Sequence, residues 1–202
     1  MKKYIQHLNS WTYSLNAKCI VYYPENLTHL KEILHKLKKE KQKVIVMGHG
    51  CSHGDLFINK NGSVINTKNL DKIKNFDKKN NCLTVEPGVN VAQVNQFLYN
   101  KNFILNSIPS SFQITIGGAI ANNVFGKDSH KNGYFEKNIN KIIYIDSNLK
   151  IRSISRKKNK LFFEKFVGSL GLLGIIIEVE LNVSELKSPY IYSKAYYLEN
   201  FD

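Results

Sequence analysis

The chain of 202 residues is long enough to form one large domain or two small ones around a buried core. Its 43% hydrophobic and 22% charged residues exclude an intrinsically disordered protein. Lysine and arginine exceed aspartate and glutamate by 29 − 16 = +13, so the surface is strongly basic.

The first half of the chain alternates predicted strands with predicted helices. Residues 17–23 carry alternating β-formers and predict a strand that ends at Pro24. Apolar residues then recur at helical spacing over 27–37, and Asn26 is placed to cap this helix. Three further strands are predicted at 43–47, 64–66 and 82–86. A second helix then follows the turn at Pro87 and Gly88, with Val91, Val94, Phe97 and Leu98 on its apolar face.

The second half of the chain contains a clear hairpin signal. Residues 142–145 and 151–154 are β-formers separated by the turn sequence Asp146-Ser147-Asn148. A final strand is predicted over 175–183, directly after the glycine cluster 168–174. Because strands and helices mix without strict βαβ alternation, the fold class is predicted as α+β rather than a doubly wound parallel sheet.

The lysines, the cysteines and the N-terminus bear on partners and location. Arginine, which reads base edges, is scarce, and we expect no nucleic-acid partner. A Lys-rich surface leaves open plain solvation, an anionic substrate or peripheral membrane contact. Cys19, Cys51 and Cys82 lie far apart without a CxxC pair, which is typical of a reducing compartment. Without an apolar signal region or a membrane-spanning run, we expect a soluble, cytoplasmic protein.

Two glycine-rich segments carry the strongest functional signal. Residues 109–133 are rich in Gly, Ala and Ser around Gly117 and Gly118, and residues 48–55 directly follow a predicted strand. Glycine lets a ligand approach the backbone closely, and successive N–H groups form a concave anion site. Neither segment has the order of a Rossmann or Walker A motif. One such segment alone is equally well interpreted as a bare glycine loop.

A metal site is the alternative interpretation of the glycine loop at residues 48–55. His49, Cys51 and His53 alternate, so an extended backbone would bring them to one side. Structural zinc sites use four ligands in spaced pairs, and only the distant His130 or Cys82 could complete this one. We therefore predict no metal.

Taken together and in order, these motifs resemble a known family. The chain is similar to the PCMH-type FAD-binding domain of the vanillyl-alcohol oxidase family. Within it, the chain most resembles the decaprenylphosphoryl-ribose oxidase branch, with the sugar-lactone oxidases next. The segments that carry the resemblance are 48–55, 84–88, 115–121, 126–135 and 168–176.

The resemblance implies an α+β fold of two subdomains, 1–108 and 109–187, with FAD between them. It also implies the cofactor site. The loop at residues 48–55 would hold the pyrophosphate, and the segment 109–133 would flank the flavin ring and ribityl chain. Ile176 would contact the adenine end. The cofactor-binding residues implied are Val46, Met47, Gly48, His49, Gly50, Cys51, Ser52, His53, Gly54, Asp55, Leu56, Ser110, Ser111, Thr115, Ile116, Gly117, Gly118, Asn122, Asn123, Val124, Phe125 and Ile176.

Two departures from the family pattern limit what it implies. Covalent members carry a histidine at the position of Cys51, so we expect non-covalent FAD here and leave a cysteinyl bond open. The oxidase branch has a histidine where this chain has Phe125, which weakens the prediction of the substrate.

The implied activity is hydride transfer to FAD from a CH–OH group of a sugar, sugar lactone or polyprenyl-phosphate sugar. Candidates for moving the hydroxyl proton are His53, Lys127 and His130, each of which is otherwise an ordinary polar loop residue. In the family the substrate binds to a following cap domain, which we expect to begin at residues 188–202. The alternative is a non-catalytic flavin-binding module, or a split product that needs a separate cap-domain chain.

Overall fold

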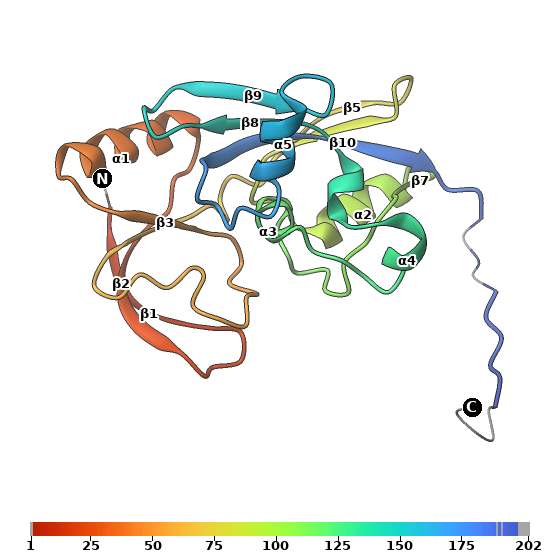
Figure 1. Cartoon of the computed structure of the whole chain (residues 1–202), viewed down its shortest axis with the longest axis horizontal. Coiled ribbons are helices and arrows are strands. Elements are labelled where there is room, and N and C mark those ends of the chain that lie inside the picture. Colours follow the sequence, from red (N-terminus) through yellow and green to blue (C-terminus); the bar gives the residue numbers. More distant parts are fainter. Residues whose placement is uncertain (1, 189, 191, 198–202) are drawn as a thin grey trace.

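The N-terminal part of the chain forms the first of two β-sheets (Figure 1). The computed structural model describes residues 2–188, 190 and 192–197. In the first sheet, β1 and β2 form an antiparallel hairpin, whereas β4 runs parallel to both β2 and β3. In spatial order its strands are β1 (Tyr4–Asn9), β2 (Asn16–Tyr22), β4 (Ser63–Asn66) and β3 (Val44–Met47).

Helix α1 (Leu27–Lys39) connects the two sheets through its buried face. The Asn26 side chain accepts a hydrogen bond of 2.9 Å from the His29 backbone N–H, which is the predicted cap. Ile33 and its apolar neighbours on this face are buried and pack in one cluster with residues of both sheets, including Ile65 of β4 and Ile177 of β10. The cluster fixes the first sheet against the second.

The second sheet is antiparallel throughout, and β10 lies at its centre. The predicted hairpin forms its β8 and β9 strands, and the predicted strand 175–183 lies within β10. Its strands are β5 (Ile73–Asp77), β6 (Cys82–Val85), β10 (Ile175–Glu185), β8 (Ile139–Ile145) and β9 (Ile151–Ser155), in that order, and β7 (Phe103–Leu105) pairs with β10.

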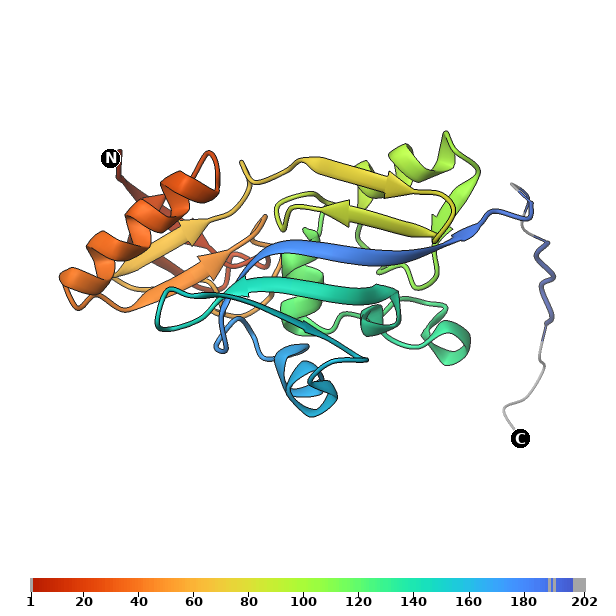
Figure 2. The ribbon, with the colours of Figure 1, turned by 90° about the horizontal axis from the view of Figure 1, so that it is seen from above.

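Short helices flank this sheet (Figures 1 and 2). A large apolar core lies against it. The core includes residues of the sheet together with Val94 of α2, Ile120 of α3 and Phe163 of α5. The helical elements are α2 (Val91–Tyr99), α3 (Ile116–Asn122), α4 (Ser129–Asn132), the 3-10 helix η1 (Phe135–Asn138) and α5 (Lys160–Phe166).

The change from one sheet to the other falls earlier than the predicted boundary at 108/109. Strands β5, β6 and β7 all pair within the second sheet, so sheet membership changes between Asn66 and Ile73. Turn residues at 87–88 and 109 do not indicate which sheet a strand joins. Strands β6 and β7 join the second sheet because they pair with β10, which lies far along the chain. The predicted mixed and antiparallel α+β architecture is confirmed.

Beyond Glu185, the described residues form no helix or strand. The rest of the predicted segment 188–202, namely 189, 191 and 198–202, lies outside the described residues. In the part of the chain that the structure describes, no helix has the length and apolar character to cross a bilayer.

Candidate functional site

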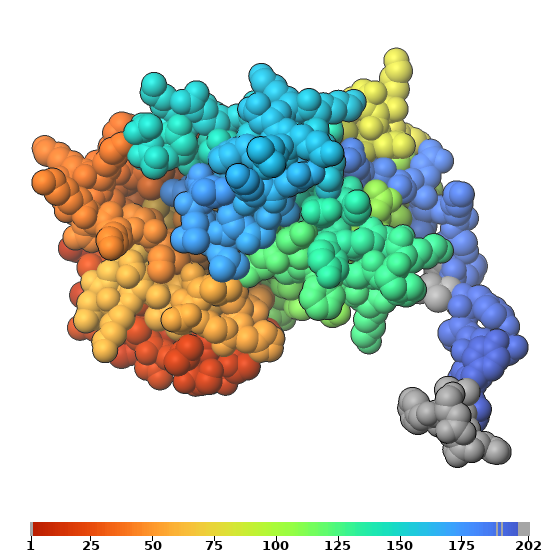
Figure 3. Space-filling view, viewed as in Figure 1, coloured from red at the N-terminus to blue at the C-terminus, as the bar shows by residue number. Residues whose placement is uncertain are grey.

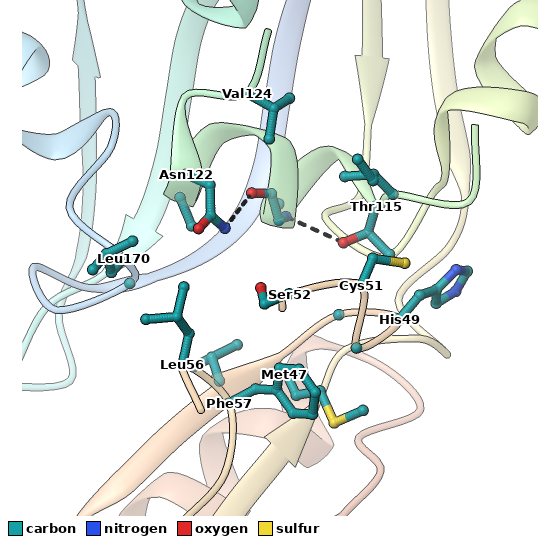
Figure 4. Close-up of a pocket in the computed structure, with 18 of the residues that line it drawn as sticks. Met47, His49, Cys51, Ser52, Leu56, Phe57, Thr115, Asn122, Val124 and Leu170 are labelled. Atoms are coloured by element: carbon teal, nitrogen blue, oxygen red, sulfur yellow. Dashed lines mark hydrogen bonds between the residues drawn. The ribbon is translucent and has the colours of Figure 1, made fainter. Parts of the chain in front are cut away.

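A large cavity opens between the loop after β3 and helix α3 (Figure 4). Its volume is about 680 Å³, within the range of small-molecule and cofactor sites. Three segments line it: residues 46–57, residues 109–125 and the region 166–176. In Figure 4, Ser52 and Leu56 of the first segment face Thr115 and Asn122 of the second, and Leu170 of the third closes one side.

Most of the predicted cofactor-binding residues line this one cavity. They come from stretches more than fifty residues apart that only the fold brings together. The predicted residues on its wall are Val46, Met47, Gly48, His49, Gly50, Cys51, Ser52, His53, Gly54, Leu56, Ser110, Ser111, Thr115, Gly117, Gly118, Asn122, Val124, Phe125 and Ile176.

Five predicted site residues do not line the cavity: Asp55, Ile116, Asn123, Lys127 and His130. Ile116 is fully buried in the core of the second sheet. Asn123 ends α3 in the left-handed conformation, and its side chain bonds to the Glu136 backbone N–H at 3.1 Å and to its carboxylate at 3.4 Å. Asp55 and Lys127 are exposed in loops, and His130 is exposed on the short helix α4.

Sequence reasoning missed several lining residues from elements it did not predict. Trp11 comes from the β1–β2 turn, where its backbone N–H donates to the Ser52 carbonyl at 2.9 Å. Phe166 comes from α5, and Leu170 from the third glycine cluster, which the resemblance had singled out without assigning it contacts. The other unpredicted lining residues are Phe57, Thr67, Pro87, Pro109, Ile114, Ala121, Ser169, Gly171 and Gly174.

The loop after β3 lines the cavity and carries backbone amides that have no acceptor within the protein. In the described part of the chain, none of the backbone N–H groups from Gly48 to Phe57 donates a hydrogen bond to another protein group. Buried and half-buried N–H groups are normally paired, so a run of free donors on a cavity wall is a feature of an anion-binding loop. Gly50 has φ = +72°, a left-handed conformation that L side chains rarely adopt.

The loop is held against the second segment at two points. A Cβ on Gly48 would lie 2.2 Å from Thr115 Oγ1, so only glycine permits this close approach. Next to it, His49 Nδ1 lies 2.9 Å from the Gln113 carbonyl oxygen and therefore carries the proton of this hydrogen bond. Together these contacts fix the width of the cavity at this end.

The glycine pair Gly117-Gly118 lies in a helix, whereas the sequence indicated a loop. The Thr115 hydroxyl accepts the Gly118 backbone N–H at 3.1 Å and so caps α3. A Cβ on Gly117 would lie 3.0 Å from the Pro87 side chain, so the small residue lets α3 approach that turn. On the next turn, Asn122 donates to the Gly118 carbonyl at 3.0 Å, drawn dashed in Figure 4.

Three titratable side chains of the described residues line the cavity: His49, Cys51 and His53. No Asp, Glu, Lys or Arg of the described residues lines it, and the described residues contain no cluster of three or more His, Cys, Asp or Glu fit to hold a metal. Burial raises the pKa of the Cys51 thiol above its ordinary value. Because only the thiolate is strongly nucleophilic, Cys51 is a weak nucleophile at neutral pH.

This pKa shift predicts the pH dependence of Cys51 alkylation. A raised pKa keeps the thiol protonated to higher pH, so the midpoint of the rate profile with iodoacetamide should lie above that of the urea-unfolded chain. Mass spectrometry of the Cys51 peptide measures this profile separately from Cys82, whose pKa is also raised by burial. Coincident midpoints in folded and unfolded chains would contradict the assignment.

The sequence profile of a family described as the FAD binding domain matches residues 19–155. The chain belongs to this family. The match spans the loop after β3, helix α3 and the β8–β9 hairpin.

Characterised relatives of this FAD-binding domain act on sugars and sugar lactones, as their names state. Decaprenylphosphoryl-beta-D-ribose oxidase of Mycolicibacterium smegmatis is 28% identical over 148 residues, which cover 73% of this chain and 32% of that protein. L-gulonolactone oxidase of Mus musculus is 23% identical, over 85% of this chain and 39% of that protein. The chain therefore spans about a third of the length of these curated relatives.

Solved structures share the fold of this FAD-binding domain. Alkyldihydroxyacetonephosphate synthase matches with a TM-score of 0.74 at 19% identity, over 82% of this chain and 32% of that one. A variant of Physcomitrella patens BBE-like 1 matches with a TM-score of 0.74 at 15% identity, over 85% of this chain and 37% of that one.

The residues present fit FAD. A pyrophosphate needs N–H donors, which the loop from Gly48 to Phe57 offers without an internal partner. A flavin ring needs a flat, largely apolar slot, and the cavity wall offers Val124, Phe166 and Ile176 beside small residues of α3. The fit rests on backbone groups and glycines rather than on charged side chains.

Proposed function

We propose that this chain is the FAD-binding part of an oxidoreductase that oxidises a CH–OH group of a sugar, sugar lactone or lipid-linked sugar. The observation that carries the proposal is the run of free backbone N–H groups on the wall of a cofactor-sized cavity. Family membership supports FAD as the ligand, and the names of the relatives support the substrate class.

Each cavity segment has a proposed role toward the cofactor. The amides from Gly48 to Phe57 neutralise the pyrophosphate, as glycine loops do in other anion sites. Residues 110–118 and 122–125 flank the ring and ribityl chain, and Ile176 contacts the adenine end. FAD itself supplies the redox chemistry by accepting a hydride equivalent from the substrate carbon.

His53 is the proposed acceptor of the hydroxyl proton. It lies on the cavity wall and is exposed, and its ring makes no hydrogen bond to another described residue. The other lining histidine, His49, uses Nδ1 for the Gln113 carbonyl. A partner-free imidazole at the mouth of the cavity is available to a substrate hydroxyl, whereas Lys127 and His130 lie outside the wall.

Replacing His53 by glutamine tests this role. The variant should bind FAD as the wild type does, because its backbone amide is unchanged, while anaerobic bleaching of bound flavin by a sugar or sugar lactone slows roughly a hundredfold. His130→Gln is the matched control and should bleach at the wild-type rate. Equal bleaching by the His53 variant, or slowed bleaching by the His130 variant, contradicts the assignment.

A flavin-binding module that needs a separate cap-domain chain is the second proposal. The curated relatives are longer than this chain, which spans about a third of their length. The module proposal predicts stable FAD binding without bleaching by any sugar substrate, and bleaching once a cap-domain chain is added. Bleaching by the chain alone would reject this second proposal.

A further inference from the structure

An apolar patch stands out on the surface formed by α5 and the loop that follows it. Leu161 is 69% exposed and Leu172 is 84% exposed, although both are large aliphatic side chains. The other exposed members are Phe162 at 36%, Leu170 at 45% and Leu173 at 39%. We call these five residues the leucine patch. Exposed apolar groups concentrated in this way mark interaction sites.

The two elements that carry the leucine patch, α5 and the loop 168–174, both approach the side chain of Tyr144. The Tyr144 ring centroid is 6.2 Å from that of Phe162, on α5. On the other side, a Cβ on Gly174 would lie 2.5 Å from the Tyr144 ring, so the loop that carries Leu172 and Leu173 ends against the same ring. Helix and loop are therefore two halves of one surface.

The leucine patch also protrudes. In Figure 2, α5 forms the outermost element on one side of the molecule, and α2 lies on the opposite side. Figure 3 shows α5 and the following loop side by side on the face that looks toward the viewer. A flat surface can therefore touch both without obstruction from the sheets.

Basic residues precede α5 and continue along it, close in the chain to the leucine patch. Between Arg156 and Gly174 the chain carries five basic side chains and one acidic one, a net charge of 5 − 1 = +4. Arg156 pairs with Glu136 at 3.4 Å, and Lys160 lies 3.9 Å from Glu164. Lys157 and Lys158 are exposed and make no ion pair with another described residue.

We propose that α5 and the loop 168–174 dock this protein on a membrane surface that contains anionic phospholipids. Aliphatic side chains flanked by free lysines match the two layers of such a surface, acyl chains and phosphate headgroups. Leu170 belongs both to the leucine patch and to the wall of the cavity. Docking thus places the rim of the cavity at the lipid interface.

Vesicle binding tests the proposal, with or without FAD. The purified chain is mixed with phosphatidylcholine vesicles or with vesicles that also contain phosphatidylglycerol, and the bound fraction is measured by sedimentation. We expect binding to the anionic vesicles, weakened by salt. The Lys157→Glu, Lys158→Glu double variant should lower the partition coefficient by about 25-fold or more, at roughly fivefold for each lysine lost.

Matched variants separate this surface from general stickiness. Leu172→Asp should lower binding roughly tenfold, whereas Tyr99→Asp, on α2 and 56% exposed, should not. The double variant Lys78→Glu, Lys79→Glu, on the β5–β6 turn, makes the same change in net charge away from the leucine patch and should bind anionic vesicles as the wild type does. Equal binding to neutral and anionic vesicles, or wild-type binding by Leu172→Asp, overturns the proposal. If the chain self-associates without lipid and Leu172→Asp abolishes this self-association, the leucine patch is a protein contact. This result would also overturn the proposal.

Discussion

Replacing Gly50 by valine is expected to abolish FAD binding. Gly50 has φ = +72°, and a Cβ there would lie 2.9 Å from the Met47 methyl group. A β-branched residue in the left-handed region costs about 1–3 kcal/mol and moves the loop from its present path. The backbone N–H groups of the loop would then be displaced from the cavity wall, and flavin should be absent after gel filtration.

The matched control for this variant lies in the same loop. A Cβ on Gly54 would meet no atom within 4 Å, and its φ is not positive, so Gly54→Ala should keep most of its flavin. Gly54→Ala should unfold in urea near the wild-type midpoint, and Gly50→Val should lose no more than its backbone strain of about 1–3 kcal/mol, so both variants stay folded in the absence of urea. Flavin retained at the wild-type level by Gly50→Val would refute the placement of the pyrophosphate.

Replacing Asn138 by alanine is expected to destabilise the fold by about 3–5 kcal/mol, a large fraction of a typical domain stability. Asn138 is fully buried. Its Oδ1 accepts the backbone N–H groups of Asn106 at 2.9 Å and Ser107 at 3.0 Å. Its Nδ2 donates to the Ser107 carbonyl at 2.7 Å. Alanine leaves these three backbone groups without partners, two of them on buried Ser107 and one on half-buried Asn106.

The same variant should loosen the second cavity segment, which begins at Pro109 directly after these bonds. Urea titration followed by circular dichroism measures the loss of stability. Asn140→Ala is the control two residues along: Asn140 is half-buried, and its bond to Glu180 is 3.5 Å long, so the cost should stay below about 1 kcal/mol. Equal stability of the two variants would show that Asn138 does not organise this region.

Local patterns predicted those parts of the fold whose signal is contained in a few residues. The cap at Asn26, the buried face of α1 and the β8–β9 hairpin are all confirmed. Strand β5 was missed because its two exposed positions, Lys74 and Asn75, are adjacent and carry little β signal, so the sequence shows no alternation of apolar and polar residues. Its pairing with β6 is a tertiary effect.

The predicted residues include those lining residues whose backbone conformation or close packing requires glycine. They do not include lining residues that reach the cavity only through packing between distant parts of the chain. Gly48 and Gly50 carry such constraints, one from Thr115 and the other from a positive φ. Trp11 and Phe166 reach the same cavity from a turn and a helix that have no glycine signature. The helical state of Gly117-Gly118 was missed because its capping bond depends on Thr115, while two adjacent glycines ordinarily disfavour a helix.

Titration of the purified, flavin-free chain with FAD tests the central claim most directly. Flavin fluorescence follows binding, and circular dichroism of the same sample reports the fold. We predict saturation at one FAD per chain for the wild type and for Gly54→Ala, and no saturable binding for Gly50→Val. A folded wild-type chain that shows no saturable FAD binding would contradict the assignment of this cavity.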